Sequence, residues 1–196
     1  MNKVFIGGSR RLTRLNKEVK KRLDNIIEKG LTVVVGDANG ADKAVQCHLA
    51  AKRYDKVVVF CMAGVCRNNI GNWPTREIAA APDSRHDFTY YSTKDRAMGS
   101  EADYALMLWD GKSRGTLTNI GDLVRQAKPV VVYLAPNKTF VTLREPDQLA
   151  LLESQLNPGS LRHPVRSQSA YQKAMALRGK IKLDVDLEGS RERRRR

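Results

Sequence analysis

Short apolar runs alternate with helical patterns along most of the chain, and this alternation limits the fold more than any other feature. The runs are four or five residues long and nearly free of charge, which is typical of strands buried on both faces of a parallel sheet. Strands that alternate with helices form βαβ units. We therefore expect an α/β fold, a Rossmann-like doubly wound parallel sheet of about five strands with helices on both faces. The expected strands are Lys3–Ile6, Leu31–Val35, Val57–Phe60, Ala105–Trp109 and Val130–Leu134.

Helices are expected where apolar residues recur every three or four positions. In Leu15–Lys29 this spacing joins Leu15, Val19 and Leu23, and Gly30 follows as a terminator. The stretch 61–92 shows little periodicity and is long for a βα loop, and such loops are usually functional or mobile. Its aromatic residues could stack on a base or could pin the loop to the domain. The other expected helices are Ala41–Arg53, Thr116–Gln126, Pro146–Gln155 and Ser169–Arg178, and the aromatic residues are Trp73, Tyr90 and Tyr91.

The charge is spread unevenly over the 196 residues. Net charge is +14, and residues 156–196 hold eleven Lys/Arg against four Asp/Glu. We expect a nucleotide-binding domain over residues 1–155 and a basic, partly disordered extension over 156–196. The terminal SRERRRR could bind nucleic acid by releasing counterions from phosphates. It could equally be a solvated tail or a cloning remnant.

Cysteine content and hydropathy indicate the class of protein. Cys47, Cys61 and Cys66 are few and odd in number, so we expect reduced, buried thiols rather than a disulfide framework or a metal site. No apolar run approaches the roughly 18 residues needed to cross a bilayer, and the N-terminus does not resemble a signal peptide. A cytoplasmic protein with no membrane partner is the expectation.

Glycine-bearing turns follow three of the expected strands. Doubly wound sheets bind ligands beyond the carboxyl ends of their strands, so these turns are the candidate ligand-binding segments. The candidate residues are Gly8, Ser9 and Arg10 after the first strand, Gly36, Asp37, Gly40 and Asp42 after the second, and Asp110, Gly111, Ser113, Arg114, Gly115 and Thr116 after the fourth.

The third turn, DGKSRGT, is a candidate phosphate site. A helix N-terminus offers free N–H groups and a favourable dipole to anions, and Ser113 and Thr116 add hydroxyl groups. The alternative is an ordinary helix cap formed by one of these hydroxyls. The turn lacks the spacing of a Walker A loop, so ATP hydrolysis of that type is not indicated.

The second turn, GDANGAD, leaves more than one interpretation open. Glycines permit unusual backbone angles or close approach, which either a nucleotide or packing alone could require. Asp37 and Asp42 could accept hydrogen bonds from ribose hydroxyls, whereas Asp42 could instead complement the dipole of the following helix.

The motifs VFIGGSR, VVVGDANGADKAV and WDGKSRGT, in this order, resemble the SLOG superfamily over residues 3–135. That superfamily includes the Lonely Guy phosphoribohydrolases, the Smf/DprA DNA-processing proteins and small standalone proteins related to YpsA, and the standalone branch is most similar. The resemblance implies a Rossmann-like fold that binds a nucleotide or nucleotide-derived ligand. It places the phosphate on Ser113–Thr116, and the ribose and base near Gly7–Arg10 and Gly36–Asp42.

Two positions depart from the Lonely Guy pattern. Asn119 stands where those enzymes carry a Glu, and Lys94 stands where they carry an Arg. A carboxylate near the anomeric carbon would stabilise the cation formed in N-glycosidic cleavage or activate water. Asp110, Asp42 or Asp37 could supply it, and Asp110 with Lys94 is the catalytic pair that we expect if the chain is a hydrolase.

Three functions therefore remain open from the sequence. The chain could bind a nucleotide-derived molecule, either as a sensor or as an N-glycosidic hydrolase. It could be a nucleic-acid-binding module that uses the basic tail, or a scaffold domain that acts through a partner. We expect a homodimer, because related proteins pair through helices, and no cofactor.

Overall fold

The computed structural model describes residues 2–62, 66–79 and 88–156. Within them, seven strands form one sheet with the order β4-β3-β2-β1-β5-β6-β7. Every neighbouring pair is parallel except β6–β7, which is antiparallel. The strands are β1 (Lys3–Gly8), β2 (Thr32–Gly36), β3 (Val57–Met62), β4 (Thr75–Ile78), β5 (Tyr104–Trp109), β6 (Val130–Leu134) and β7 (Thr139–Leu143).

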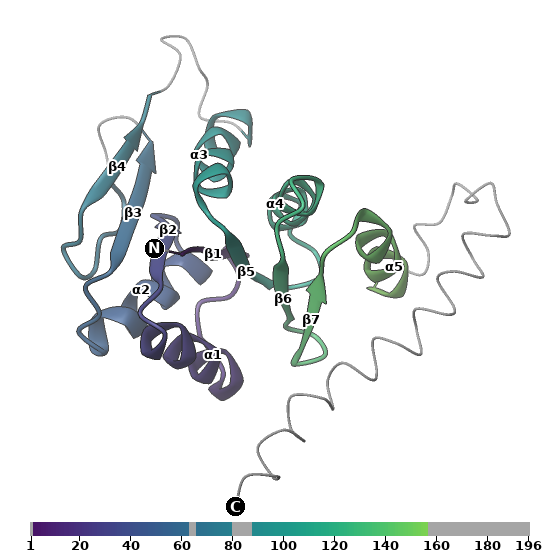
Figure 1. The fold of residues 1–196 in the computed structure, drawn as a ribbon, viewed down its shortest axis with the longest axis horizontal. Helices are drawn as coiled ribbons and strands as arrows, with labels where there is room; N and C mark the ends of the chain where they lie inside the picture. Colours follow the sequence, from purple (N-terminus) through teal and green to yellow (C-terminus); the bar gives the residue numbers. More distant parts are fainter. Residues whose placement is uncertain (1, 63–65, 80–87, 157–196) are drawn as a thin grey trace, which may run out of the picture. The chain divides into compact units, whose positions relative to one another are not determined.

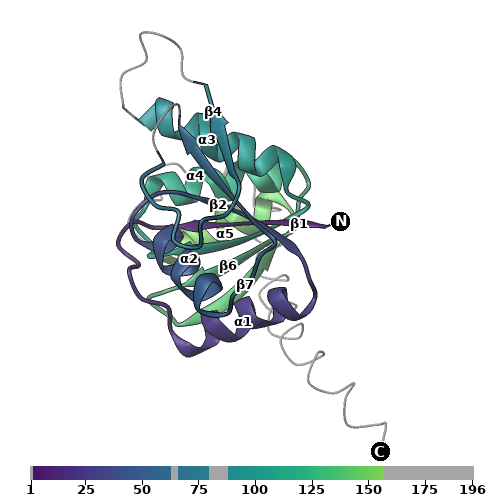
Figure 2. The same ribbon diagram turned by 90° about the vertical axis from the view of Figure 1, so that its left-hand side faces the viewer.

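Helices cover both faces of the sheet (Figure 1). Helices α1 and α2 lie on one face, and α3 and α4 lie on the other, as the perpendicular view in Figure 2 also shows. The expected Rossmann-like α/β class is confirmed. The four helices are α1 (Lys17–Glu28), α2 (Ala41–Ala51), α3 (Phe88–Glu101) and α4 (Arg114–Arg125).

Burial on both faces explains the continuous apolar runs of the central strands. Val33, Val34 and Val35 of β2 are fully buried although their side chains alternate between the faces. Valines in succession therefore fit β2 without a polar face. The edge strands differ, because most residues of β4 and β7 are exposed or half-buried.

Three elements were not expected from the sequence. The short strand β4 and the helix α3 fall in or after the stretch 61–92, and β7 follows the last expected strand. The helix α3 lacks a clear apolar period because it buries Ser92 and Lys94 beside Met98. Strand β4 carries Thr-Arg-Glu, which an edge strand tolerates since one side faces solvent.

The chain divides into two compact units, Met1–Arg144 and Glu145–Arg196. The first contains the whole sheet. In the second, the described part includes α5 (Pro146–Leu156), close to the expected Pro146–Gln155. The expected helix Ser169–Arg178 and the basic terminus lie outside the described residues, and the boundary at residue 155 stays a prediction. No described helix combines the length and apolar character that crossing a bilayer requires.

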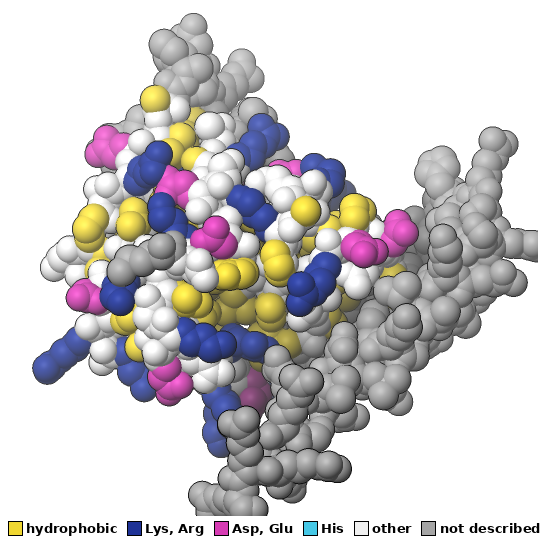
Figure 3. Space-filling view, viewed as in Figure 1, with side chains coloured by type: hydrophobic (Ala, Val, Ile, Leu, Met, Phe, Trp, Pro, Cys, Tyr) yellow, Lys and Arg dark blue, Asp and Glu magenta, His cyan; other side chains and the backbone are white. Residues whose placement is uncertain are grey.

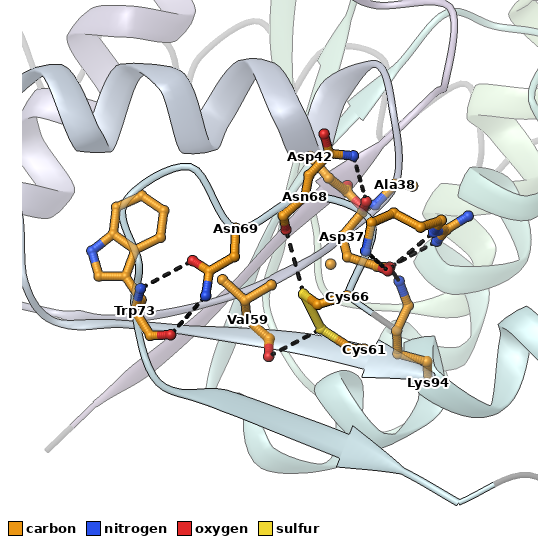
Figure 4. Close-up of a disulfide and its surroundings, with 12 residues drawn as sticks. Asp37, Ala38, Asp42, Val59, Cys61, Cys66, Asn68, Asn69, Trp73 and Lys94 are labelled. Atoms are coloured by element: carbon orange, nitrogen blue, oxygen red, sulfur yellow. Dashed lines mark hydrogen bonds and ion pairs between the residues drawn. A yellow bond between two sulfur atoms is a disulfide. The ribbon is translucent and has the colours of Figure 1, made fainter. Parts of the chain in front are cut away.

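The expectation of reduced, buried thiols is wrong. Cys61 and Cys66 form a disulfide, and the third cysteine, Cys47, is free but exposed. Cys61 is the last residue but one of β3. Its Cα atom lies 5.1 Å from that of Cys66, well within the span of a disulfide. Figure 4 shows this bond in close-up, with Asp37 and Lys94 nearby.

Candidate functional site

A cleft lies at the carboxyl ends of β1, β2 and β5. The chain crosses from β1 towards β2 and from β5 towards β6, so the strand order reverses between β1 and β5. In doubly wound folds ligands bind at such a switch point. The cleft measures about 410 Å³. Its lining comprises Phe5, Gly7, Gly8, Arg10, Ala38, Asp42, Arg67, Tyr91, Ser92, Lys94, Asp95, Met98, Ser113, Gly115, Thr116 and Asn119.

Seven of the candidate residues line this cleft and seven do not. The residues at the cleft come from all three turns and from α3, which brings Lys94. The others lie behind the lining or beside it, where several of them hold the turns together. The first group is Gly8, Arg10, Asp42, Lys94, Ser113, Gly115 and Thr116; the second is Ser9, Gly36, Asp37, Gly40, Asp110, Gly111 and Arg114.

The second turn requires glycine at positions 36 and 40 because other parts of the protein pack directly against the backbone there. A side chain on Gly40 would overlap the backbone of Arg10, and Gly40 also has a φ of +85°, which L-residues rarely adopt. A Cβ on Gly36 would overlap the carboxylate of Asp42 and lie 2.9 Å from Lys94 Nζ. Of the two interpretations, close packing accounts for both glycines.

Asp37 is occupied by a buried ion-pair network. Its carboxylate lies 2.6 Å from Lys94 Nζ and 2.7 Å from a terminal nitrogen of Arg67, whose Nε and backbone N–H also donate to it. Both Asp37 and Lys94 are almost fully buried. Burial would raise the pKa of Asp37, but Arg67 and Lys94 outweigh it and hold this pKa well below its usual range. The network fixes α3 and the loop carrying Arg67 to the end of β2 (Figure 4).

The ion-pair network and the disulfide together occupy the one group of possible metal ligands found among the described residues. Ligand atoms of Asp37, Cys61 and Cys66 lie within 4.8 Å of one another. The sulfur atoms are bonded to each other, so they are not the thiolates that metals bind. The carboxylate already faces two cations.

Asp42 has a different environment, although it lies close by on α2. Its side chain is buried, lines the cleft and accepts a hydrogen bond from the Ala38 N–H at 3.3 Å. Burial raises its pKa to about 7, and the charge of Lys94 only partly offsets this effect. Asp42 can therefore hold or release a proton near neutral pH.

Asp95 is a second cleft carboxyl group with a raised pKa. It follows Lys94 on α3, and Asn119 Nδ2 of α4 donates to it at 2.8 Å. Burial raises the pKa of Asp95, while Lys94 and the Asn119 amide act in the opposite direction. The position where Lonely Guy enzymes carry a Glu thus holds an amide that orients an aspartate of the facing helix.

The N-terminus of α4 opens into the cleft. Ser113 is the N-cap, and its Oγ accepts hydrogen bonds from the Thr116 N–H and hydroxyl at 3.4 and 3.0 Å. The expected helix cap is therefore present. It leaves other first-turn N–H groups without intrahelical partners, and Gly115 lines the cleft without a side chain in front of them.

Asp110 supports this turn from behind. Its carboxylate accepts the N–H groups of Lys112 and Ser113 at 3.1 and 2.8 Å. Burial would raise the pKa of Asp110, yet these N–H groups, with the Ser9 hydroxyl, lower it below its usual range. A carboxylate held in this way shapes the turn before α4, and Asp110 is not among the residues that line the cleft.

Two guanidinium groups and an aromatic ring stand together at the cleft. Arg10 and Arg67 place their Cζ atoms 5.1 and 4.9 Å from the centre of the Tyr91 ring. The other two aromatic candidates are buried: Trp73 donates from Nε1 to the Tyr54 carbonyl, and Tyr90 packs edge-on against Tyr91. Tyr91 is therefore the aromatic residue placed to meet a ligand.

Several cleft residues were not candidates from the sequence. Arg67 lies in the loop after β3, while Ser92, Asp95 and Met98 lie on α3. Adjacent positions 94 and 95 carry opposite charges, which a solvated helix face also shows, so no local pattern marks them. Their proximity depends on how α3 crosses the sheet.

Comparison with known proteins shows a likeness in fold. No protein-family model matches the chain, and no curated protein matches it significantly. Among solved structures, the chain is similar to DNA processing protein A from Helicobacter pylori, with a TM-score of 0.53 and 16% identity over 92% of this chain and 81% of that chain. The solved protein was studied for its mode of single-stranded DNA binding. At this identity the likeness shows a shared fold, which agrees with the fold that the SLOG motifs imply.

Proposed function

We propose that the cleft binds a nucleotide or nucleotide-derived molecule with its phosphate on the first turn of α4. The observation that carries the proposal is the meeting of Gly115, Arg10 and Tyr91 at one cleft. Free N–H groups and a guanidinium bind phosphate, and an aromatic ring stacks on a base. The volume of about 410 Å³ lies within the range of roughly 300–1,000 Å³ typical of small-molecule sites.

The proposed site also contains groups suited to cleaving the ligand. Asp42 and Asp95 line the cleft, and the pKa of each is raised. Asp42, whose pKa burial raises to about 7, can donate or accept a proton near neutral pH. In an N-glycosidic hydrolase these two would replace Asp110 and Lys94, which other contacts occupy.

Isothermal titration with a panel of nucleoside mono- and diphosphates tests the binding proposal. Arg10→Ala should weaken binding at least tenfold, because a charge-assisted contact to phosphate is lost. Arg11→Ala is the matched control, since Arg11 is an exposed neighbour outside the lining. Absence of heat with every nucleotide would refute the proposal. Release of the free base by the unmodified chain but not by Asp95→Asn would separate a hydrolase from a sensor.

A second candidate function is binding of single-stranded nucleic acid. It is favoured by the likeness to a protein studied for single-stranded DNA binding and by the net charge of +14. Such binding should weaken steeply with salt, because cations that neutralise phosphates release counterions. Deletion of residues 157–196 measures how much of it the basic tail provides.

A further inference from the structure

A dense group of cations follows β1 and continues onto α1. Between Arg10 and Lys29 the chain holds eight Lys/Arg and three Asp/Glu. Seven of these cations are exposed, and five of the seven follow one another between Arg11 and Lys21. We call these five the basic track: Arg11, Arg14, Lys17, Lys20 and Lys21.

The track residues have no ion-pair partner among the described residues. Some exposed cations elsewhere are paired, as in Arg76–Glu101 and Arg125–Asp122. The one aspartate of α1, Asp24, is turned towards α2, where it pairs with His48 and Lys52. Helix α1 also carries two exposed glutamates, Glu18 and Glu28. Neither forms an ion pair with a track residue in the described part of the chain, and the five cations of the track outnumber them.

The geometry of α1 places these charges in a line. Lys17, Lys20 and Lys21 are three and four positions apart, so they share one face of the helix. Figure 3 shows Lys and Arg side chains gathered over the part of the molecule where Figure 1 draws α1. The twelve residues of α1 span about 18 Å, a length that matches several nucleotides of an extended strand.

An aromatic side chain borders the track. Arg22 of α1 places its Cζ 5.0 Å from the centre of the Phe140 ring, which lies half-buried on the edge strand β7. Asn16, the N-cap of α1, donates to the Tyr133 hydroxyl at 2.6 Å and so fixes the helix to β6. Cations beside an aromatic ring on a rigid element are the usual components of a single-strand binding surface.

The track also begins at the cleft. Arg10 lines the cleft, and Arg11 is the first residue of the track. The cleft is lined by residues of α3 and α4, whereas α1 lies on the opposite face of the sheet. A strand that places one nucleotide in the cleft would therefore pass round the end of β1, at Arg10 and Arg11, to reach α1.

We propose that the basic track and Phe140 form a binding surface for the phosphodiester backbone and bases of single-stranded nucleic acid. This inference rests on the second candidate function and locates it on the sheet domain rather than on the basic tail. The small-ligand function of the cleft does not depend on it.

Fluorescence anisotropy of labelled dT20 with the full chain tests the proposal. The variant Arg14→Glu/Lys17→Glu/Lys21→Glu should raise Kd by at least about thirtyfold and reduce the slope of log K against log salt by about 2, for three lost contacts. The matched control, Lys43→Glu/Arg53→Glu/Lys56→Glu, changes net charge equally at exposed positions outside the track and the cleft lining and should raise Kd no more than about threefold. Phe140→Leu should weaken binding about fivefold without altering the salt slope, because only stacking is lost.

Each outcome distinguishes the inference from the function on which it rests. If the unmodified chain does not bind dT20, the nucleic-acid function fails and the inference with it. If it binds but the track and control variants lose affinity equally, or deletion of 157–196 alone abolishes binding, the track assignment is wrong while the function stands. Track-dependent binding to phosphatidylglycerol vesicles without binding to dT20 would assign the surface to membranes and overturn the proposal.

Discussion

Replacing Lys94 should show how much the buried network contributes to stability. Lys94 Nζ lies 2.6 Å from Asp37, and both side chains are at most 2% exposed. At an effective dielectric constant of about 20 their attraction is about 6 kcal/mol. Arg67 would still contact Asp37 after the replacement, so part of this energy remains. We expect Lys94→Met to lower the free energy of unfolding by about 3–5 kcal/mol, as for other broken buried pairs.

A double-mutant cycle separates the ion pair from simple loss of packing. Asp37→Asn alone should also be strongly destabilising, because it leaves Lys94 buried without its anion. The double variant Asp37→Asn/Lys94→Met should be less destabilised than the sum of the single variants, since neither charge is left alone. We expect a coupling energy of at least about 2 kcal/mol.

Urea denaturation at pH 7.5 provides the assay. The two tryptophans, Trp73 and Trp109, are both buried and report unfolding of the sheet domain by fluorescence. With an m-value near 2 kcal/mol/M, Lys94→Met should lower the midpoint by about 2 M. A shift below about 0.5 M, or additive single effects, would refute the view that the pair holds α3 against β2.

Three further outcomes are expected. Asp42 binds its proton more tightly in the folded chain, with a pKa of about 7 against 3.8, so the free energy of unfolding should fall as pH rises from about 4 to 7. Asp42→Asn should remove up to about 4 kcal/mol of this pH dependence, measured by denaturation at pH 4 and pH 8. Identical pH profiles for the variant and the unmodified chain would contradict this expectation. Gly40→Ala should lower the free energy of unfolding by more than about 2 kcal/mol, because its Cβ would overlap the backbone of Arg10 at a residue with positive φ. The control Gly99→Ala, within helix α3, should leave this free energy unchanged or raise it in the same denaturation experiments. Thiol titration of the denatured chain should detect one thiol, Cys47, before reduction and three after it; three at the outset would exclude the disulfide.

The central sheet could be predicted because burial on both faces leaves a direct trace in sequence. Runs such as TVVV in β2 need no polar positions. The edge strands β4 and β7 leave a weaker trace, since exposed edges accept charged and polar residues. The helix α3 left none, because it buries Lys94 in an ion pair whose partner lies 57 positions away.

The sequence predicted which end of the sheet carries the cleft, but only some of the residues that line it. The strand-end rule located the turns at the cleft, and Ser113, Gly115 and Thr116 line it. Local sequence could not reveal that Gly36 and Gly40 serve close packing of the protein against itself. Nor could it reveal Asp95, whose role depends on Asn119 of another helix. Such residues become visible only when the crossing of α3 and α4 is known.

Native mass spectrometry of the chain purified directly from cells is the measurement that tests the central proposal most directly. The account predicts a nucleotide-sized adduct at one per chain, released on denaturation, and its loss in Arg10→Ala but not in Arg11→Ala. Addition of nucleoside mono- and diphosphates should restore the adduct wherever purification has removed it. A chain that stays unliganded with every nucleotide, or an adduct that persists in Arg10→Ala, would contradict the assignment of the cleft.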